Sequence, residues 1–92
     1  MATVVITAEV EDVGTWEEGF RTHGDLFRSQ TCFDPVQIAI GENNTVALIQ
    51  HPEDLDTFMA LLDSPATHEA MAHDGVKRET VRVFVIDREM EL

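Results

Sequence analysis

Residues 36–51, VQIAIGENNTVALIQH, carry the pattern that decides the fold. In the run 36–40 apolar residues recur at every second position, and the run 45–51 is again typical of an extended strand. Between them the segment 41–44, GENN, consists of residues that favour turns and tolerate positive φ angles. The whole stretch therefore predicts an antiparallel β-hairpin.

Two further strands are expected towards the ends of the chain. Residues 3–10 alternate, with Val4 and Ile6 on one face and Val5 on the other. Residues 80–86 form a β-branched run that contains Phe84. Each run has the length and composition of a single strand.

A helix is expected between the first strand and the hairpin. The sequence from Thr15 to Glu18 fits a capping box, which places the start of the helix at Thr15. Trp16 and Phe20 then follow at helical spacing, with His23 on the same face. Glycines lower helical propensity, so we expect the helix to fray after His23.

Two helices are expected between the hairpin and the last strand. Residues 55–62 place apolar side chains at helical spacing after Pro52. Ser64 and Pro65 are typical of the cap and first turn of a new short helix, and Gly75 suits its C-terminal cap. The order strand, helix, strand, strand, helices, strand predicts an α+β, ferredoxin-like domain over residues 1–92. Its four-stranded antiparallel sheet would carry the helices on one face.

The other face of the predicted sheet is apolar. If Val4, Ile6, Ile38, Leu48 and Val83 pack on the helices, the opposite face carries Val5, Ala39, Ala47, Ile49, Phe84 and Ile86. A sheet face that meets water is normally polar, and a large exposed apolar patch marks an interface. We therefore expect a homodimer in which a second copy covers this face.

The composition excludes several kinds of partner. The 92 residues include 18 acidic and 6 basic side chains, a formal net charge of −12. Nucleic-acid and anionic-membrane binding both rely on clustered Lys and Arg, so neither is expected. The single cysteine, Cys32, excludes an internal disulfide. With no secretory signal and no apolar run near the ~20 residues of a membrane span, we expect a cytoplasmic protein.

Two motifs together resemble a known superfamily. The pattern Val-x-Asp-x-x-x-Trp-x-x-x-Phe-x-x-His is represented by Val10, Asp12, Trp16, Phe20 and His23. The pattern Leu-x-Ser-Pro-x-x-x-Glu-Ala-Met-x-x-x-Gly-Val is represented by Leu62, Ser64, Pro65, Glu69, Ala70, Met71, Gly75 and Val76. With these motifs nearly the whole chain resembles the dimeric α+β-barrel superfamily of antibiotic-biosynthesis-monooxygenase-like domains, in particular a branch of small, largely uncharacterised bacterial proteins.

This resemblance implies a dimeric barrel, and it leaves the chemistry open. The superfamily includes oxygenases, isomerases, cyclases and haem-degrading enzymes. The haem-degrading members use an Asn and a haem-ligating His inside the pocket, whereas Asn43 and Asn44 fall in the predicted hairpin turn. We therefore expect no haem and no other cofactor.

His23 is the candidate catalytic residue, because an imidazole on an apolar helix face can transfer protons at cellular pH. It would lie in a ligand pocket between sheet and helices that is lined by Trp16, Phe20, His23 and Phe84. The alternative is a structural histidine at the edge of the core, bonded to the backbone. Under that alternative the aromatic side chains are simply part of the core.

The remaining candidates are weaker. His51, His68 and His73 show no metal-ligand spacing, and Glu69 with His73 is more typical of exposed neighbours, so no metal site is expected. Cys32 would act as a nucleophile only if His23 approached it, and a lone cysteine near a helix end is more typical of an inert apolar residue. Arg28 would either bind an anionic ligand or complement the helix dipole.

Two functions follow from these features. The first is a protein that binds a small apolar ligand, with His23 as the proton-transfer residue of a cofactor-independent monooxygenase, isomerase or cyclase. An aromatic or polyketide-like substrate is implied by the resemblance alone. The second is a non-catalytic dimerisation or ligand-sensing module in which His23 is structural.

Overall fold

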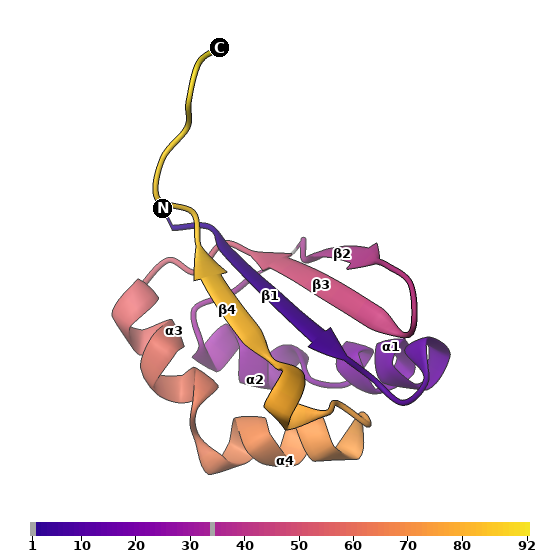
Figure 1. Cartoon of the computed structure of the whole chain (residues 1–92). Helices are drawn as coiled ribbons and strands as arrows, with labels where there is room; N and C mark the ends of the chain where they lie inside the picture. The colour runs from indigo at the N-terminus through magenta and orange to yellow at the C-terminus, as the bar shows by residue number, and fades with distance from the viewer. Residues whose placement is uncertain (1, 34) are drawn as a thin grey trace.

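A computed structural model of the chain describes residues 2–33 and 35–92. Its centre is a four-stranded antiparallel sheet in the order β2-β3-β1-β4 (Figure 1). The strands are β1 (Val4–Glu9), β2 (Gln37–Ile40), β3 (Thr45–Gln50) and β4 (Arg82–Val85). The order places the first strand in the middle of the sheet and confirms the predicted ferredoxin-like arrangement.

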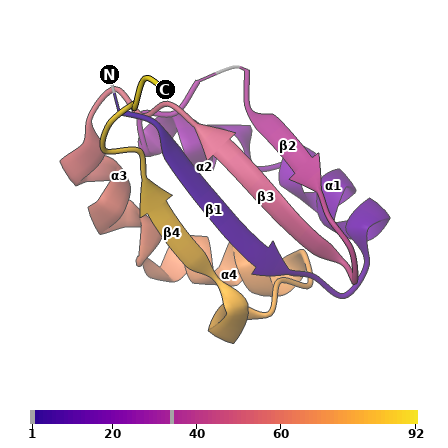
Figure 2. The same ribbon diagram turned by 45° about the horizontal axis from the view of Figure 1, so that its top comes forward.

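The helices all lie on one face of this sheet (Figure 1), and Figure 2 shows its other face uncovered. They are α1 (Val13–Arg21), α2 (Gly24–Ser29), α3 (Leu55–Leu62) and α4 (Pro65–His73), followed by a short 3₁₀ turn at Arg78–Thr80. The first pair covers β2 and β3, whereas α3 and α4 lie nearer to β4 (Figure 2). The space enclosed by sheet and helices is therefore bounded by two helix pairs that come from the two halves of the chain.

The hairpin has the predicted geometry. β2 pairs with β3 in a register that places Ile38 opposite Leu48, and the turn between them has φ angles of 56° at Asn43 and 58° at Asn44. Positive φ at both residues is what a tight turn between twisted strands requires. The register of the hairpin, and therefore the face on which each side chain lies, follows from this turn.

The first helix differs from its prediction at both ends. It begins at Val13, with Asp12 as the N-cap, and the predicted cap residue Thr15 instead donates its backbone N–H and its hydroxyl to the Asp12 carboxylate, each over 2.9 Å. These two bonds hold the pKa of Asp12 below its usual value of 3.8, so they stabilise the fold above that pH and are lost as the pH falls through the lower folded value. The helix does not fray after His23 but ends at Arg21, and α2 begins at Gly24.

The second half follows its prediction more closely. Asp54 caps α3, and Ser64 caps α4 with Pro65 in its first turn. Gly75, just beyond α4, has a φ of 77°, which side chains with a Cβ avoid. Pro52 lies before α3 rather than in its first turn, since the helix begins at Leu55.

The core forms two clusters beneath the sheet. One cluster joins Val4 and Ile6 of β1 to Phe58 of α3 and to Cys32, and the other joins Val10, Trp16 and Val46. β1 contributes Val4 and Ile6 to the first cluster, and Val10, directly beyond its end, continues the same alternation into the second. The central strand thus organises the core along its whole length.

The face of the sheet opposite the helices carries the predicted apolar residues. The register places Phe84 opposite Val5, and Val5 opposite Ile49, all on this open face. Phe84 is 58% exposed and Ile86 is 54% exposed. Among residues 2–33 and 35–92 no helix is long and apolar enough to cross a membrane.

Candidate functional site

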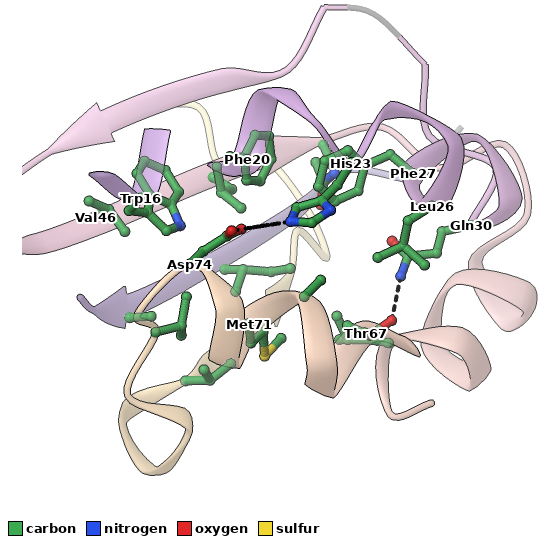
Figure 3. A pocket seen from close by; sticks show the side chains of 18 residues that line it. Trp16, Phe20, His23, Leu26, Phe27, Gln30, Val46, Thr67, Met71 and Asp74 are labelled. Atoms are coloured by element: carbon green, nitrogen blue, oxygen red, sulfur yellow. Dashed lines mark hydrogen bonds and ion pairs between the residues drawn. The ribbon is translucent and has the colours of Figure 1, made fainter. Parts of the chain in front are cut away.

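An apolar cavity of about 70 Å³ lies between the sheet and the helices. Ile6 and Leu48 line it from the sheet, and aromatic side chains of α1 and α2 line it from above (Figure 3). Among this apolar lining are a few polar side chains, chiefly His23, Gln50 and Asp74, with the Gln30–Thr67 pair at one end. An apolar pocket with a few convergent polar groups is the usual form of a small-molecule site.

His23 enters the cavity from the junction between α1 and α2. Its Nε2 lies 3.0 Å from Oδ2 and 3.2 Å from Oδ1 of Asp74 (Figure 3). Its ring meets Phe27 edge-on, with centroids 6.5 Å apart. The break between the two helices therefore positions the histidine, and two contacts fix its ring.

Asp74 is the C-cap residue of α4, and its side chain is only 4% exposed. Besides His23, it contacts His73, whose Nδ1 lies 2.9 Å from Oδ1. It also lies directly against Gly19 of α1, where a Cβ atom would be 2.1 Å from Oδ1. The missing side chain at Gly19 is what lets the carboxylate reach the histidine across the two helix pairs.

The surroundings of Asp74 determine what His23 can do. Within the described ranges, 2–33 and 35–92, its ion-pair partners are His23 and His73, with no Lys or Arg among them. A carboxylate that accepts the Nε2–H of an imidazole leaves the lone pair on Nδ1 and stabilises the imidazolium once that nitrogen takes a proton. The pair thus has the parts of a general base with its orienting group.

Gln50 adds a second polar group to the cavity. It is 2% exposed, and its position opposite Val4 in the sheet turns its side chain towards the helices. No residue in the described part of the chain accepts a hydrogen bond from its Nε2. A buried donor without a partner costs about 1–3 kcal/mol, so this amide favours a ligand that brings an acceptor.

Gln30 provides a contrast within the same cavity. It is equally buried, but its Nε2 donates to Thr67 Oγ1 over 2.9 Å (Figure 3). Thr67 Oγ1 in turn lies 2.7 Å from the Leu61 carbonyl oxygen, to which it donates. This hydrogen bond joins the end of α2 to α4, whereas the Nε2 of Gln50 has no acceptor among the described residues.

The predicted pocket residues are brought together with one exception. Trp16, Phe20 and His23 all line the cavity. Phe84 does not, because its register opposite Val5 turns it to the open face of the sheet, where it is 58% exposed. The prediction that Phe84 lines this pocket is therefore wrong, since one strand residue cannot serve both faces.

Most of the weaker candidates lie apart from the cavity, and His73 is the exception because it contacts Asp74. Arg28 pairs with Asp25 on the surface of α2, His51 lies 3.0 Å from the Thr3 hydroxyl, and His68 pairs with Asp63 over 3.0 Å. Cys32 is buried in the core, and burial raises the pKa of its thiol to about 11. The thiol is therefore neutral at cellular pH and unsuited to act as a nucleophile.

Two residues of the site were not anticipated from the sequence. Asp74 is one of 18 acidic side chains and sits at a helix end, where a solvated carboxylate is the ordinary case. The sequence does contain a signal for Gln50 as a cavity residue, because it is a polar side chain at a strand position that the alternation turns towards the helices. The pairing of Asp74 with His23 required the fold, since 51 residues separate them.

No protein-family model matches the chain, and no curated protein sequence matches it. Several solved structures are nevertheless similar. A Bordetella bronchiseptica protein provisionally assigned as an antibiotic biosynthesis monooxygenase has a TM-score of 0.73 at 16% identity over 97% of each chain. SnoaB, a cofactor-independent oxygenase from Streptomyces nogalater, has a TM-score of 0.68 at 19% identity over 99% of this chain and 95% of its own. A provisionally assigned monooxygenase from Deinococcus radiodurans has a TM-score of 0.62 at 11% identity over 100% and 96%.

These similarities establish the fold. The chain has the α+β architecture of the antibiotic-biosynthesis-monooxygenase-like proteins, which confirms the resemblance seen in the sequence at the level of fold. Its place in the small bacterial branch stays a prediction. Because one fold hosts many activities, the function must be argued from the residues of the cavity.

The contact between Gly19 and Asp74 gives the first prediction. In Gly19→Ala the new Cβ would overlap the carboxylate, so α1 or Asp74 must move. We expect the free energy of unfolding to fall by about 1–3 kcal/mol, measured by urea denaturation. Gly14→Ala, in the same helix, meets its nearest atom at 3.4 Å and should leave stability unchanged or slightly higher. Equal losses in both variants would contradict this account of Gly19.

Proposed function

We propose that this protein binds a small apolar ligand that carries a hydrogen-bond acceptor, in the cavity between the sheet and the helices. The observation that carries the proposal is the unpartnered Nε2 of Gln50, buried in the wall of an apolar cavity that also holds the His23–Asp74 pair. A ligand carbonyl placed against Gln50 would supply the missing acceptor. The apolar lining would bind the rest of the molecule.

The size of the cavity limits the ligand. About 70 Å³ is well below the ~300–1,000 Å³ of sites for drug-sized molecules, so larger ligands require its wall to move. Phe20 and Phe27, with ring centroids 4.5 Å apart, line both this cavity and an outer groove of about 430 Å³ beside β2. Rotation of these two half-buried rings would join the two spaces and admit a larger aromatic ligand.

The chemistry we propose is proton transfer by His23. With its Nε2–H donated to Asp74, the ring takes a proton at Nδ1 from a carbon next to the ligand carbonyl, and the electron pair moves onto the carbonyl oxygen to form an enolate. The Gln50 amide stabilises this oxygen, and Asp74 stabilises the imidazolium. In an isomerisation the imidazolium returns the proton to a different atom of the enolate, whereas in a cyclisation the enolate carbon attacks a second carbonyl of the ligand and that oxygen takes the proton. The similarity to the cofactor-independent oxygenase SnoaB supports chemistry of this cofactor-free kind.

A non-catalytic ligand-sensing module is the second candidate. Of the three polar side chains, His23 alone would transfer a proton, because Gln50 only donates a hydrogen bond and Asp74 acts through the histidine. A protein that binds the ligand through Gln50 without turning it over would have this second function.

We further propose that a second copy covers the open face of the sheet, which forms the dimeric barrel. The apolar residues that point away from the helices include Val5, Ile49, Phe84 and Ile86. A chain of 92 residues buries only about 60–65% of its unfolded surface by itself, so covering this face adds materially to its stability. A two-fold axis through this face would bring the same apolar residues of the two copies together, so the face can pair with itself.

The ligand proposal predicts opposite responses from two buried glutamines. Acetophenone serves as the test ligand, because it is small, apolar and carries one carbonyl. Gln50→Met should weaken its binding about 5–30-fold while stability holds or rises, since an unpartnered donor is removed. Gln30→Met should instead lower the free energy of unfolding by about 1–3 kcal/mol, because it leaves Thr67 without its donor. Titrations followed by NMR and urea denaturation measure both, and unchanged acetophenone affinity in Gln50→Met would contradict the role of Gln50.

The catalytic proposal predicts that the protein speeds exchange of the acetophenone methyl protons in D₂O. His23→Ala should slow this exchange by at least about 100-fold, as expected when a general base is lost. His68→Ala is the matched control, because His68 also pairs with an aspartate but lies outside the cavity. If wild type binds acetophenone without exchange, the sensing module is supported. If His23→Ala only loses stability, His23 is structural.

The dimer proposal is tested by charge on the open face. Phe84→Glu and Ile49→Glu should each convert the dimer to a monomer, because a carboxylate cannot be buried against the apolar face of a partner. Met59→Glu places the same charge at an exposed position on α3 and should leave the dimer intact. Native mass spectrometry reads the subunit number, and a dimer mass in all three variants would contradict this interface.

A further inference from the structure

We propose that His23, His73 and Asp74 bind one divalent transition-metal ion of the Zn²⁺ class at the edge of the cavity. Each residue offers one donor atom, and these atoms all lie within 4.8 Å of one another. His23 comes from the junction of α1 and α2, and the other two from the end of α4. The inference goes beyond the proposed ligand and proton chemistry, and it reverses the expectation from sequence that the chain has no metal site.

The donor set suits such an ion. Two imidazole nitrogens and one carboxylate oxygen are ligands that Zn²⁺ and its neighbours accept, with positions left open for water or a ligand. The Oδ1 atom of Asp74 lies 3.2 Å from the Nε2 of His23 and 2.9 Å from the Nδ1 of His73. Ligand atoms that lie roughly 2.0–2.2 Å from one tetrahedral metal are about 3.3–3.6 Å from each other, so side-chain shifts of less than about 1 Å would bring these contacts to the required spacing.

The charge of the cluster also favours a cation. The Asp74 carboxylate is 4% exposed, and in the described part of the chain its ion-pair partners are the two histidines. Buried charges in proteins are paired or coordinate metals. With a formal net charge of −12, the chain as a whole attracts cations as well.

The site is reachable from solvent. The His73 side chain is 71% exposed, whereas that of His23 is 19% exposed and faces the cavity. An ion would therefore meet His73 first and come to rest between the surface and the cavity wall. His73 is also the one member of the cluster that the proposed proton transfer does not use, which separates the two proposals experimentally.

The test uses the untagged full chain, stripped of metal with a chelator and then titrated with Zn²⁺ by calorimetry and with Co²⁺ by visible absorption. We expect one ion per chain, with the d–d absorption of a bound Co²⁺. His73→Ala should weaken Zn²⁺ binding by at least about 100-fold, since loss of an outer partner alone costs 10–100-fold. His68→Ala is the matched control and should bind as wild type does, because the His68–Asp63 pair lacks a second histidine.

Two results would overturn the proposal. The first is an absence of stoichiometric Zn²⁺ binding by wild type. The second is equal affinity in His73→Ala and wild type, which would place the ion elsewhere. Because His73 is mostly exposed, its replacement should leave the fold intact, and circular dichroism verifies this. Acetophenone binding by metal-free His73→Ala should equal that of metal-free wild type, so failure of the metal site and failure of the ligand pocket give different results.

Discussion

The buried carboxylate of Asp74 is the group on which the site depends. It ends α4, lies against the bare backbone of Gly19 in α1, and bonds to His23 at the start of α2. These contacts join the two helix pairs that close the cavity, so one side chain both completes the enclosure and orients the histidine inside it. Any change that moves α1 away from α4 must alter the histidine as well, which is why stability and site geometry are coupled here.

One inward position of the sheet departs from its apolar pattern. Alternation along β1 and β3 sends apolar side chains towards the helices, which forms a dry core, yet the last inward position of β3 is Gln50. A buried amide normally finds a partner, as Gln30 does at Thr67. The Nε2 of Gln50 has none among the described residues, so its burial carries a free-energy cost that a ligand acceptor would relieve.

Sequence patterns over a few residues are sufficient to predict the fold, but they are not sufficient to predict the residues of the site. Alternation, the Asn43–Asn44 turn and the Ser64–Pro65 cap each act over a few residues, so they could be read directly. The start of α1 was misplaced because Thr15 and Asp12 both suit a cap, and the geometry favours Asp12 with Thr15 as its donor. The prediction that Phe84 lines the pocket fails because strand register turns its side chain to the other face. Asp74 was missed because its role depends on Gly19 and His23, which are distant in sequence and share no local signal with it.

The proton transfer and the metal site both use Nε2 of His23, so a bound ion should affect the exchange chemistry. When this nitrogen carries a proton shared with Asp74, the lone pair is on Nδ1, and the ring can accept a proton from a ligand. With a metal ion bound at Nε2, that proton would pass to solvent and the neutral ring would carry its remaining proton on Nδ1, which donates and does not act as a base. Binding of Zn²⁺ should therefore stop the exchange of acetophenone protons in wild type and leave it unchanged in His73→Ala. His23 beside Asp74 would then have two mutually exclusive states. In one state its Nε2 carries a proton, and in the other its Nε2 binds a metal ion.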